Sequence, residues 1–197
     1  MNINNQLLDG DTIRMFFNDD MGYDIKARTD NLKRIAFAAK LLSDNLPNKL
    51  STTYFTNSGT EAIEGAMKLA KRVNGRSEII YCKDSYHGST QGSLSVMGNE
   101  EYKSKYRPLL PNCKQIIFND IKSLDSISLK TSAVIIETIQ GGSGFKIAEN
   151  FFLNELNNRC KNNNVLIIMD GIQTCYGRTG KLFGFEHTDV IPDILCI

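Results

Sequence analysis

Four short segments of the sequence combine small, hydroxyl-bearing or ionisable residues with the start or the end of a predicted element. The first, Asn57-Ser58-Gly59-Thr60-Glu61-Ala62, opens a predicted helix. Free backbone N–H groups and the positive end of the helix dipole make such a start a favourable place for a phosphate group. Gly59 allows close backbone approach, and the Ser58 and Thr60 hydroxyls can donate to phosphate oxygens. A helix start that is merely capped by a hydroxyl explains the same residues.

Asp170 follows the most apolar run of the chain and precedes Gly171-Ile172-Gln173. In open α/β sheets, ligand-binding groups gather beyond the carboxyl ends of the strands, where this carboxylate falls. A carboxylate there can hold a ring nitrogen protonated, which makes a pyridine ring an electron sink. A cap on the following turn explains Asp170 alone equally well.

Two further segments follow other apolar runs. Tyr86-His87-Gly88 lies in a loop rich in small residues, where the tyrosine ring could lie flat against a planar ligand. A surface tyrosine beside a structural histidine is the simpler alternative. Glu137 and Gln140 lead into Gly141-Gly142-Ser143-Gly144, and no phosphate-loop lysine follows, so a nucleotide P-loop is not supported.

The elements that must position these segments begin at about residue 53. Continuous apolar runs, typical of strands in a sheet covered on both faces, occupy residues 79–82, 116–118, 133–136 and 165–169. Helical patterns occupy residues 61–72 and 150–162, and an amphipathic helix is predicted over 31–46, before Pro47. The alternation predicts an α/β fold with a mostly parallel sheet and flanking helices.

The overall composition is that of an ordinary globular chain. Of its 197 residues, 41% are hydrophobic and 23% charged, and the net charge of +1 gives no reason to expect nucleic acid or an anionic membrane as partner. Apolar runs fall far short of the roughly 20 residues of a membrane span. Without a secretion signal, a cytoplasmic protein is predicted. Five cysteines without metal-ligand spacing predict reduced thiols and no metal site.

Taken in order, the four segments resemble the class III aminotransferases, a group that includes acetylornithine and ornithine aminotransferases. The resemblance extends from about Leu41 to the end of the chain. It implies pyridoxal 5'-phosphate as cofactor and a large domain of fold type I. We expect residues 47–197 to form an incomplete version of that domain, after a divergent N-terminal segment over 1–46.

The resemblance also implies roles for individual residues. Gly59 and Thr60, next to Ser58, resemble the residues that hold the cofactor phosphate, and Asp170 resembles the partner of the ring nitrogen. Tyr86 resembles the aromatic residue stacked on the pyridine ring.

The remaining implied residues complete the pocket. Ile172 would pack on the opposite ring face, and Gln173 would reach the phenolic oxygen of the ring. Glu137 would help to shape the site, and His87, next to the stacked tyrosine, is included among the cofactor-binding residues.

Several positions depart from the family pattern. Gly171 and Gly142 stand where glutamates are usual, and Thr138 replaces a proline. The family places its Schiff-base lysine soon after the stretch that Pro192-Asp193-Ile194-Leu195 resembles, and no lysine of the chain matches that position. We therefore expect no catalytic lysine within these residues and little or no transaminase activity from this polypeptide by itself.

The resemblance implies an ornithine-like amino donor, 2-oxoglutarate as acceptor, a homodimer and a place in amino-acid metabolism. Two alternatives remain open. One is another fold type I enzyme, such as a decarboxylase or racemase. The other is a non-catalytic remnant or interaction protein, to which Gly142 and Gly171 point. A lysine encoded soon after Ile197 would favour a fragment of a normal enzyme, whereas a stop codon would favour the remnant.

Overall fold

The computed structural model describes residue 22 and residues 24–197, and the chain divides into two compact units, 1–57 and 58–197. Within the first unit, helix α2 spans Ile25–Asn45. It begins earlier than the predicted residue 31 because Asp24 Oδ1 accepts the Ala27 N–H at 2.8 Å and caps the helix. Residues 1–21 and 23 of the predicted divergent segment lie outside the described residues. The predicted limits of 1–46 and 47–197 stay a prediction.

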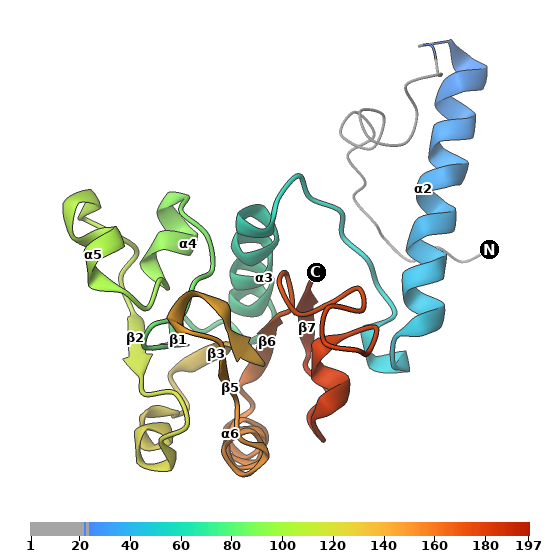
Figure 1. The fold of residues 1–197 in the computed structure, drawn as a ribbon. Helices are drawn as coiled ribbons and strands as arrows, with labels where there is room; N and C mark the ends of the chain where they lie inside the picture. The colour runs from blue at the N-terminus through green and yellow to red at the C-terminus, as the bar shows by residue number, and fades with distance from the viewer. Residues whose placement is uncertain (1–21, 23) are drawn as a thin grey trace. The chain divides into compact units, whose positions relative to one another are not determined.

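A five-stranded, fully parallel sheet forms the centre of the second unit (Figure 1). In chain order its strands are β1 (Glu78–Cys82), β2 (Cys113–Ile116), β3 (Thr131–Glu137), β6 (Leu166–Asp170) and β7 (Ile194–Cys196). They are arranged in the order β2-β1-β3-β6-β7. All residues of β3 are buried, as expected for a central strand covered on both faces. The predicted α/β fold with a parallel sheet is confirmed.

Helices cover both faces of this sheet. One face packs against α3 (Gly59–Asn74), whose buried Ile63 and Met67 join Ile79, Ile135 and Ile168 in one apolar cluster. Helix α6 (Asn150–Asn163) lies on the opposite side of the strands in Figure 1 and buries an apolar stripe of its own. The buried residues of that stripe are Phe152, Leu153, Leu156 and Cys160.

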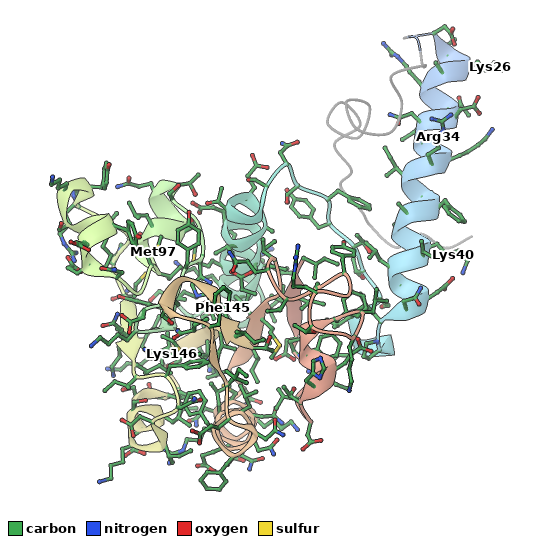
Figure 2. All side chains as sticks on the ribbon, viewed as in Figure 1. Lys26, Arg34, Lys40, Met97, Phe145 and Lys146 are labelled. Atoms are coloured by element: carbon green, nitrogen blue, oxygen red, sulfur yellow. The ribbon has the colours of Figure 1, made fainter. Side chains whose placement is uncertain are left out.

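Shorter elements connect the strands and helices. They are α4 (Gln91–Ser95), α5 (Glu100–Lys103), the hairpin strands β4 (Ile139–Gln140) and β5 (Lys146–Ile147), and the 3₁₀ turns at Asn48–Leu50, Ser104–Tyr106, Ile121–Ser126, Gly141–Ser143 and Gly184–His187. Figure 2 labels Phe145 and Lys146 at the hairpin and Met97 in the turn between α4 and α5. Strand β2 ends at Ile116, before the predicted residue 118, because its partner β1 ends at Cys82, which pairs with Ile116.

The carboxyl ends of the parallel strands meet at one edge of the sheet. Glu137 ends β3 directly beside Asp170, the last residue of β6, and Asp170 in turn lies beside Cys196 of β7. Ionisable residues far apart in the sequence are thereby brought together.

No helix of the described residues is long and apolar enough to cross a membrane. All five cysteines are free in the structure.

Candidate active site

Asp170 is a buried side chain at the carboxyl edge, and both of its carboxylate oxygens have partners. Its carboxylate is only 6% exposed, and its Oδ2 lies 2.8 Å from Nδ1 of the fully buried His87. Oδ1 accepts the backbone N–H of Ile172 at 3.1 Å. The capping role considered for Asp170 is therefore real, and it coexists with a buried pairing to the segment that follows β1.

Glu137 is the second buried carboxylate at this edge. Its Oε2 accepts the backbone N–H of Tyr86 at 3.3 Å. Burial raises the pKa of Glu137 to about 7; His87 and the backbone N–H groups of Tyr86 and Gly141 oppose this rise, while repulsion by Asp170 adds to it. Glu137 therefore carries a proton for part of the time near neutral pH, and the two neighbouring carboxyl groups avoid both being charged.

The start of α3 supplies backbone donors to the site. Ser58 is the N-cap, and its Oγ accepts the Glu61 N–H at 3.3 Å, so the helix begins at Gly59 rather than at the predicted residue 61. The capped start considered as an alternative is present in the structure. A Cβ atom on Gly59 would lie 3.0 Å from Cγ1 of Ile172, so the helix start contacts the segment after Asp170.

Thr60 belongs to a network of hydroxyl groups that sequence reasoning did not find. Its Oγ1 lies 2.6 Å from Ser93 Oγ and 2.8 Å from Thr90 Oγ1. Glu64 Oε1 accepts the Thr90 hydroxyl at 2.7 Å and the Ser93 N–H at 3.1 Å. The network fastens the loop after β1 to α3. One signal was available, because Glu64 follows Thr60 by one helical turn and shares its face.

The segment after β1 can approach α3 this closely because residue 88 is a glycine. Gly88 has a φ of 115°, which L residues with a side chain rarely adopt, and a Cβ atom there would collide with the Thr60 side chain.

Tyr86 and Ile172 remain 47% and 42% exposed. Two apolar surfaces are therefore open to a ligand.

Gln173 lies against the glycine turn that follows β4. A Cβ atom on Gly141 would collide with the Gln173 carboxamide, so the two segments are in contact. The structure thus links the predicted site residues in pairs: His87 with Asp170, Tyr86 with Glu137, and Gly59 with Ile172. The predicted segments converge on one edge of the sheet.

The two glycines that depart from the family pattern differ in their surroundings. A Cβ atom on Gly171 would collide with Cys175 Sγ and lie 3.1 Å from the Cys196 carbonyl oxygen. A Cβ atom on Gly142 would meet only the Cβ of Tyr86, at an ordinary 3.6 Å. A larger side chain is therefore excluded at Gly171, where Cys175 fills the space, but not at Gly142.

A cavity of about 1320 Å³ adjoins these residues. Its lining includes Gly141, Ile172 and Gln173, together with Phe145 of the hairpin and Arg178 of the loop after β6. Asp170, Glu137 and Tyr86 do not line it. The cavity therefore adjoins the segment that follows Asp170, because Ile172 and Gln173 belong to its lining and the Ile172 N–H is bonded to Asp170.

Comparison with known proteins decides the family. The family model for class III aminotransferases matches residues 25–197, beginning before Leu41, where the sequence resemblance starts. This chain belongs to the class III aminotransferases. Class III aminotransferases are pyridoxal 5'-phosphate-dependent enzymes.

Two relatives illustrate the similarity. Acetylornithine aminotransferase of Methanopyrus kandleri is 39% identical over a region that covers 82% of this chain and 42% of the relative. LysW-aminoadipate semialdehyde/glutamate semialdehyde transaminase of Sulfolobus acidocaldarius is 44% identical over 76% of this chain and 38% of the relative. The chain thus spans about two fifths of the length of these class III relatives.

Solved structures agree with the class III assignment. Ornithine aminotransferase from Toxoplasma gondii superposes with a TM-score of 0.67 at 31% identity, covering 71% of this chain and 35% of that chain. Its crystals had partial occupancy of pyridoxal 5'-phosphate at the active site. A transaminase from the marine bacterium Virgibacillus superposes with a TM-score of 0.74 at 28% identity, covering 80% of this chain and 40% of that chain.

The contact between Gly171 and Cys175 predicts a measurable coupling in this class III chain. Gly171→Ala should lower the free energy of unfolding by roughly 1–3 kcal/mol, because the added methyl group overpacks the space filled by Cys175 Sγ. The double variant Gly171→Ala/Cys175→Ala should lose less than the sum of the two single variants. Urea unfolding of the four proteins measures the coupling, and strictly additive losses would contradict it.

The raised pKa of Glu137 predicts a pH dependence of stability. Between pH 4.5, its ordinary pKa, and about 7, the folded state holds more protons than the unfolded state, so stability falls as the pH rises through this window. Glu137→Gln should remove this part of the slope, a difference of roughly 1–3 kcal/mol. Urea unfolding at several pH values measures it, with the exposed Glu101→Gln as matched control. A parental slope in Glu137→Gln is the contrary result.

Proposed function

We propose that the carboxyl edge of the sheet binds pyridoxal 5'-phosphate. In this proposal the phosphate lies at the start of α3, at Ser58, Gly59 and Thr60, and the ring nitrogen meets Asp170. The observation that carries the proposal is the contact of Gly59 with Ile172, two residues after the buried Asp170. That contact brings phosphate donors and a carboxylate within reach of one small ligand.

The residues present fit the ring of this cofactor as well. Tyr86 and Ile172 offer partly exposed apolar surfaces for its two faces. In this proposal Gln173 reaches the phenolic oxygen. Glu137 supports Tyr86 by accepting a hydrogen bond from its backbone N–H. His87 contributes to the proposed site through its hydrogen bond with Asp170.

The bound cofactor supplies an electron sink for chemistry at the α-carbon of an amino acid. The residues of this chain hold and tune it. Backbone N–H groups at the start of α3 balance the phosphate charge, because they are at the positive end of the helix. Asp170 holds a proton on the ring nitrogen, since a buried carboxylate favours the charged ring. Tyr86 and Ile172 exclude water from the ring faces.

For the whole protein, we propose transfer of an amino group from an ornithine-like or acetylornithine-like amino acid to 2-oxoglutarate, within amino-acid metabolism. The relatives named above support the reaction type. A cytoplasmic homodimer belongs to this proposal and rests on family resemblance.

One observation favours a second possibility, a class III chain without catalytic function. Cys175 occupies the space beside Gly171, so the glutamate that is usual there cannot be accommodated without rearrangement. Such a change is compatible with a binding or interaction protein that keeps the cofactor pocket. Turnover and cofactor binding therefore need separate tests.

Cofactor binding tests the role of Asp170. Titration of the 197-residue protein with pyridoxal 5'-phosphate should give reversible, non-covalent binding. Asp170→Ala should weaken it about 10–100-fold, because a charge-assisted hydrogen bond to the ring nitrogen is lost. Absorbance or fluorescence titration measures the dissociation constants, and Asp189→Ala, at an exposed aspartate, is the matched control. Unchanged affinity in Asp170→Ala would rule out the assignment.

Turnover tests the expectation that these residues contain no Schiff-base lysine. We expect the 197-residue polypeptide, mixed with pyridoxal 5'-phosphate, ornithine or acetylornithine and 2-oxoglutarate, to form little or no glutamate. The reason is that no lysine of these residues matches the position that exchanges the amino group in the family. A coupled glutamate assay measures this. Turnover at rates ordinary for enzymes, about 1 per second or faster, is the contrary outcome.

A further inference from the structure

A second cavity, of about 420 Å³, lies beside the edge strand β2, and none of its lining residues belongs to the proposed cofactor site. Its walls come from the end of β1, from β2 and from the region of α4 and α5. Pockets for small molecules have volumes of about 300–1,000 Å³. The cavity is therefore large enough for a small organic molecule.

Lys103, the last residue of α5, brings a buried cation into the wall of this cavity. Its side chain is only 6% exposed. Nζ donates to the carbonyl oxygen of Met97, labelled in Figure 2, and to the Tyr81 hydroxyl oxygen, each at 2.8 Å. Nζ also lies 4.7 Å from the centroid of the Tyr81 ring. Its hydrogen-bond partners within the described part of the chain are therefore neutral.

The carboxylate paired with Lys103 is too far away and too exposed to balance this charge. Glu100 Oε2 lies 3.9 Å from Lys103 Nζ, beyond hydrogen-bond distance, and the Glu100 side chain is 60% exposed. The other oxygen of Glu100 accepts from the Arg107 guanidinium instead. A buried ammonium group without a close counter-ion is costly. An anion in the cavity would lower that cost.

The hydrogen-bond inventory of Lys103 and Tyr81 leaves two donors that point to the same need. An ammonium group can only donate, so the Tyr81 oxygen is the acceptor in their contact, and the Tyr81 hydrogen needs another partner. Tyr81 is 6% exposed, and no acceptor for this hydrogen is found among the residues that the structure describes. Lys103 likewise has a third hydrogen beyond those given to Met97 and Tyr81. Buried donors are nearly always paired, so an acceptor is expected in the cavity.

The charged residues around the cavity also favour an anion. Three cationic side chains line it, Lys103, the exposed Lys83 and Arg107, against two carboxylates, Asp84 and Glu100. Both carboxylates already have partners outside the cavity centre, because Asp84 pairs with Lys146 at 3.4 Å and Glu100 pairs with Arg107. The lining therefore has an excess of positive charge.

We propose that this cavity binds a small organic anion, whose carboxylate or phosphate group accepts hydrogen bonds from Lys103 Nζ and from the Tyr81 hydroxyl. The two donor atoms are 2.8 Å apart, so one acid group can accept from both. Lys83 adds positive charge on the exposed side of the cavity. This binding site goes beyond the proposed function, because it needs neither the cofactor nor any residue of the cofactor site.

Titration with simple anions tests the site directly. Sodium acetate and inorganic phosphate are added separately to the 197-residue protein, and backbone amide signals are followed in ¹H–¹⁵N spectra. The amides of Gly98, Lys103 and Gln115 should shift along a saturating curve, with a dissociation constant of about 1 mM or tighter in at least one of the two titrations. The stronger of the two identifies the acid group.

Sodium chloride at the same ionic strength is the control, because it screens charges without offering a carboxylate or phosphate acceptor. Equal shifts with chloride, or no saturating shift with either acetate or phosphate, would overturn the proposal. The cofactor site is read from other amides, those of the start of α3 and of Ile172, so the failure of one site leaves the other measurable.

Three variants assign the binding to the buried pair. Lys103→Met should weaken anion binding about tenfold or more, and Tyr81→Phe about tenfold, because each removes a hydrogen bond to a charged group. Lys105→Gln, at an exposed lysine outside the lining, should keep the parental dissociation constant. Parental affinity in Tyr81→Phe or Lys103→Met is the contrary result. Tyr81→Phe keeps the aromatic ring and decides the matter if Lys103→Met does not fold.

Discussion

In a parallel sheet every strand ends at the same edge, and this constraint governs the candidate site. The register of β3 and β6 sets Glu137 beside Asp170, two carboxyl groups that would repel each other if both were ionised. Burial raises the pKa of Glu137 to about 7. Asp170 instead has two polar partners, His87 Nδ1 and the Ile172 N–H. The pairing of β3 with β6 therefore determines which carboxyl groups lie together at the site.

The helix α3 provides the opposite polarity at the same edge. Its capped start lies against Ile172, and the Thr60, Thr90 and Ser93 hydroxyls join it to the loop that bears Tyr86 and His87. Glu64 fastens this loop by accepting from it. The positive end of α3 and the buried carboxyl group of Asp170 are thus linked through Ile172, an arrangement suited to a ligand with a phosphate at one end and a cationic ring at the other.

The strongly patterned features could be predicted from the sequence. Continuous apolar runs predicted the central strands, and Asp170 and Glu137 were located by the rule that ligands bind beyond carboxyl strand ends. The spacing of Thr60 and Glu64 indicates only a shared helix face. Their partners Thr90 and Ser93 lie 26 or more residues further along the chain and are brought to them by the packing of α4 on α3, which the sequence does not reveal. Likewise, the space taken by Cys175 beside Gly171 follows from tertiary packing, and no local pattern encodes it.

The central claim is that one ligand joins the start of α3 to the end of β6. The most direct test follows backbone amide signals in ¹H–¹⁵N spectra of the 197-residue protein during titration with pyridoxal 5'-phosphate. We predict that the amides of Gly59, Thr60 and Ile172 shift together along one binding curve. Inorganic phosphate should move the α3 amides more than that of Ile172. Shifts confined to the cavity around Phe145 and Arg178, or no shifts at all, would contradict the account.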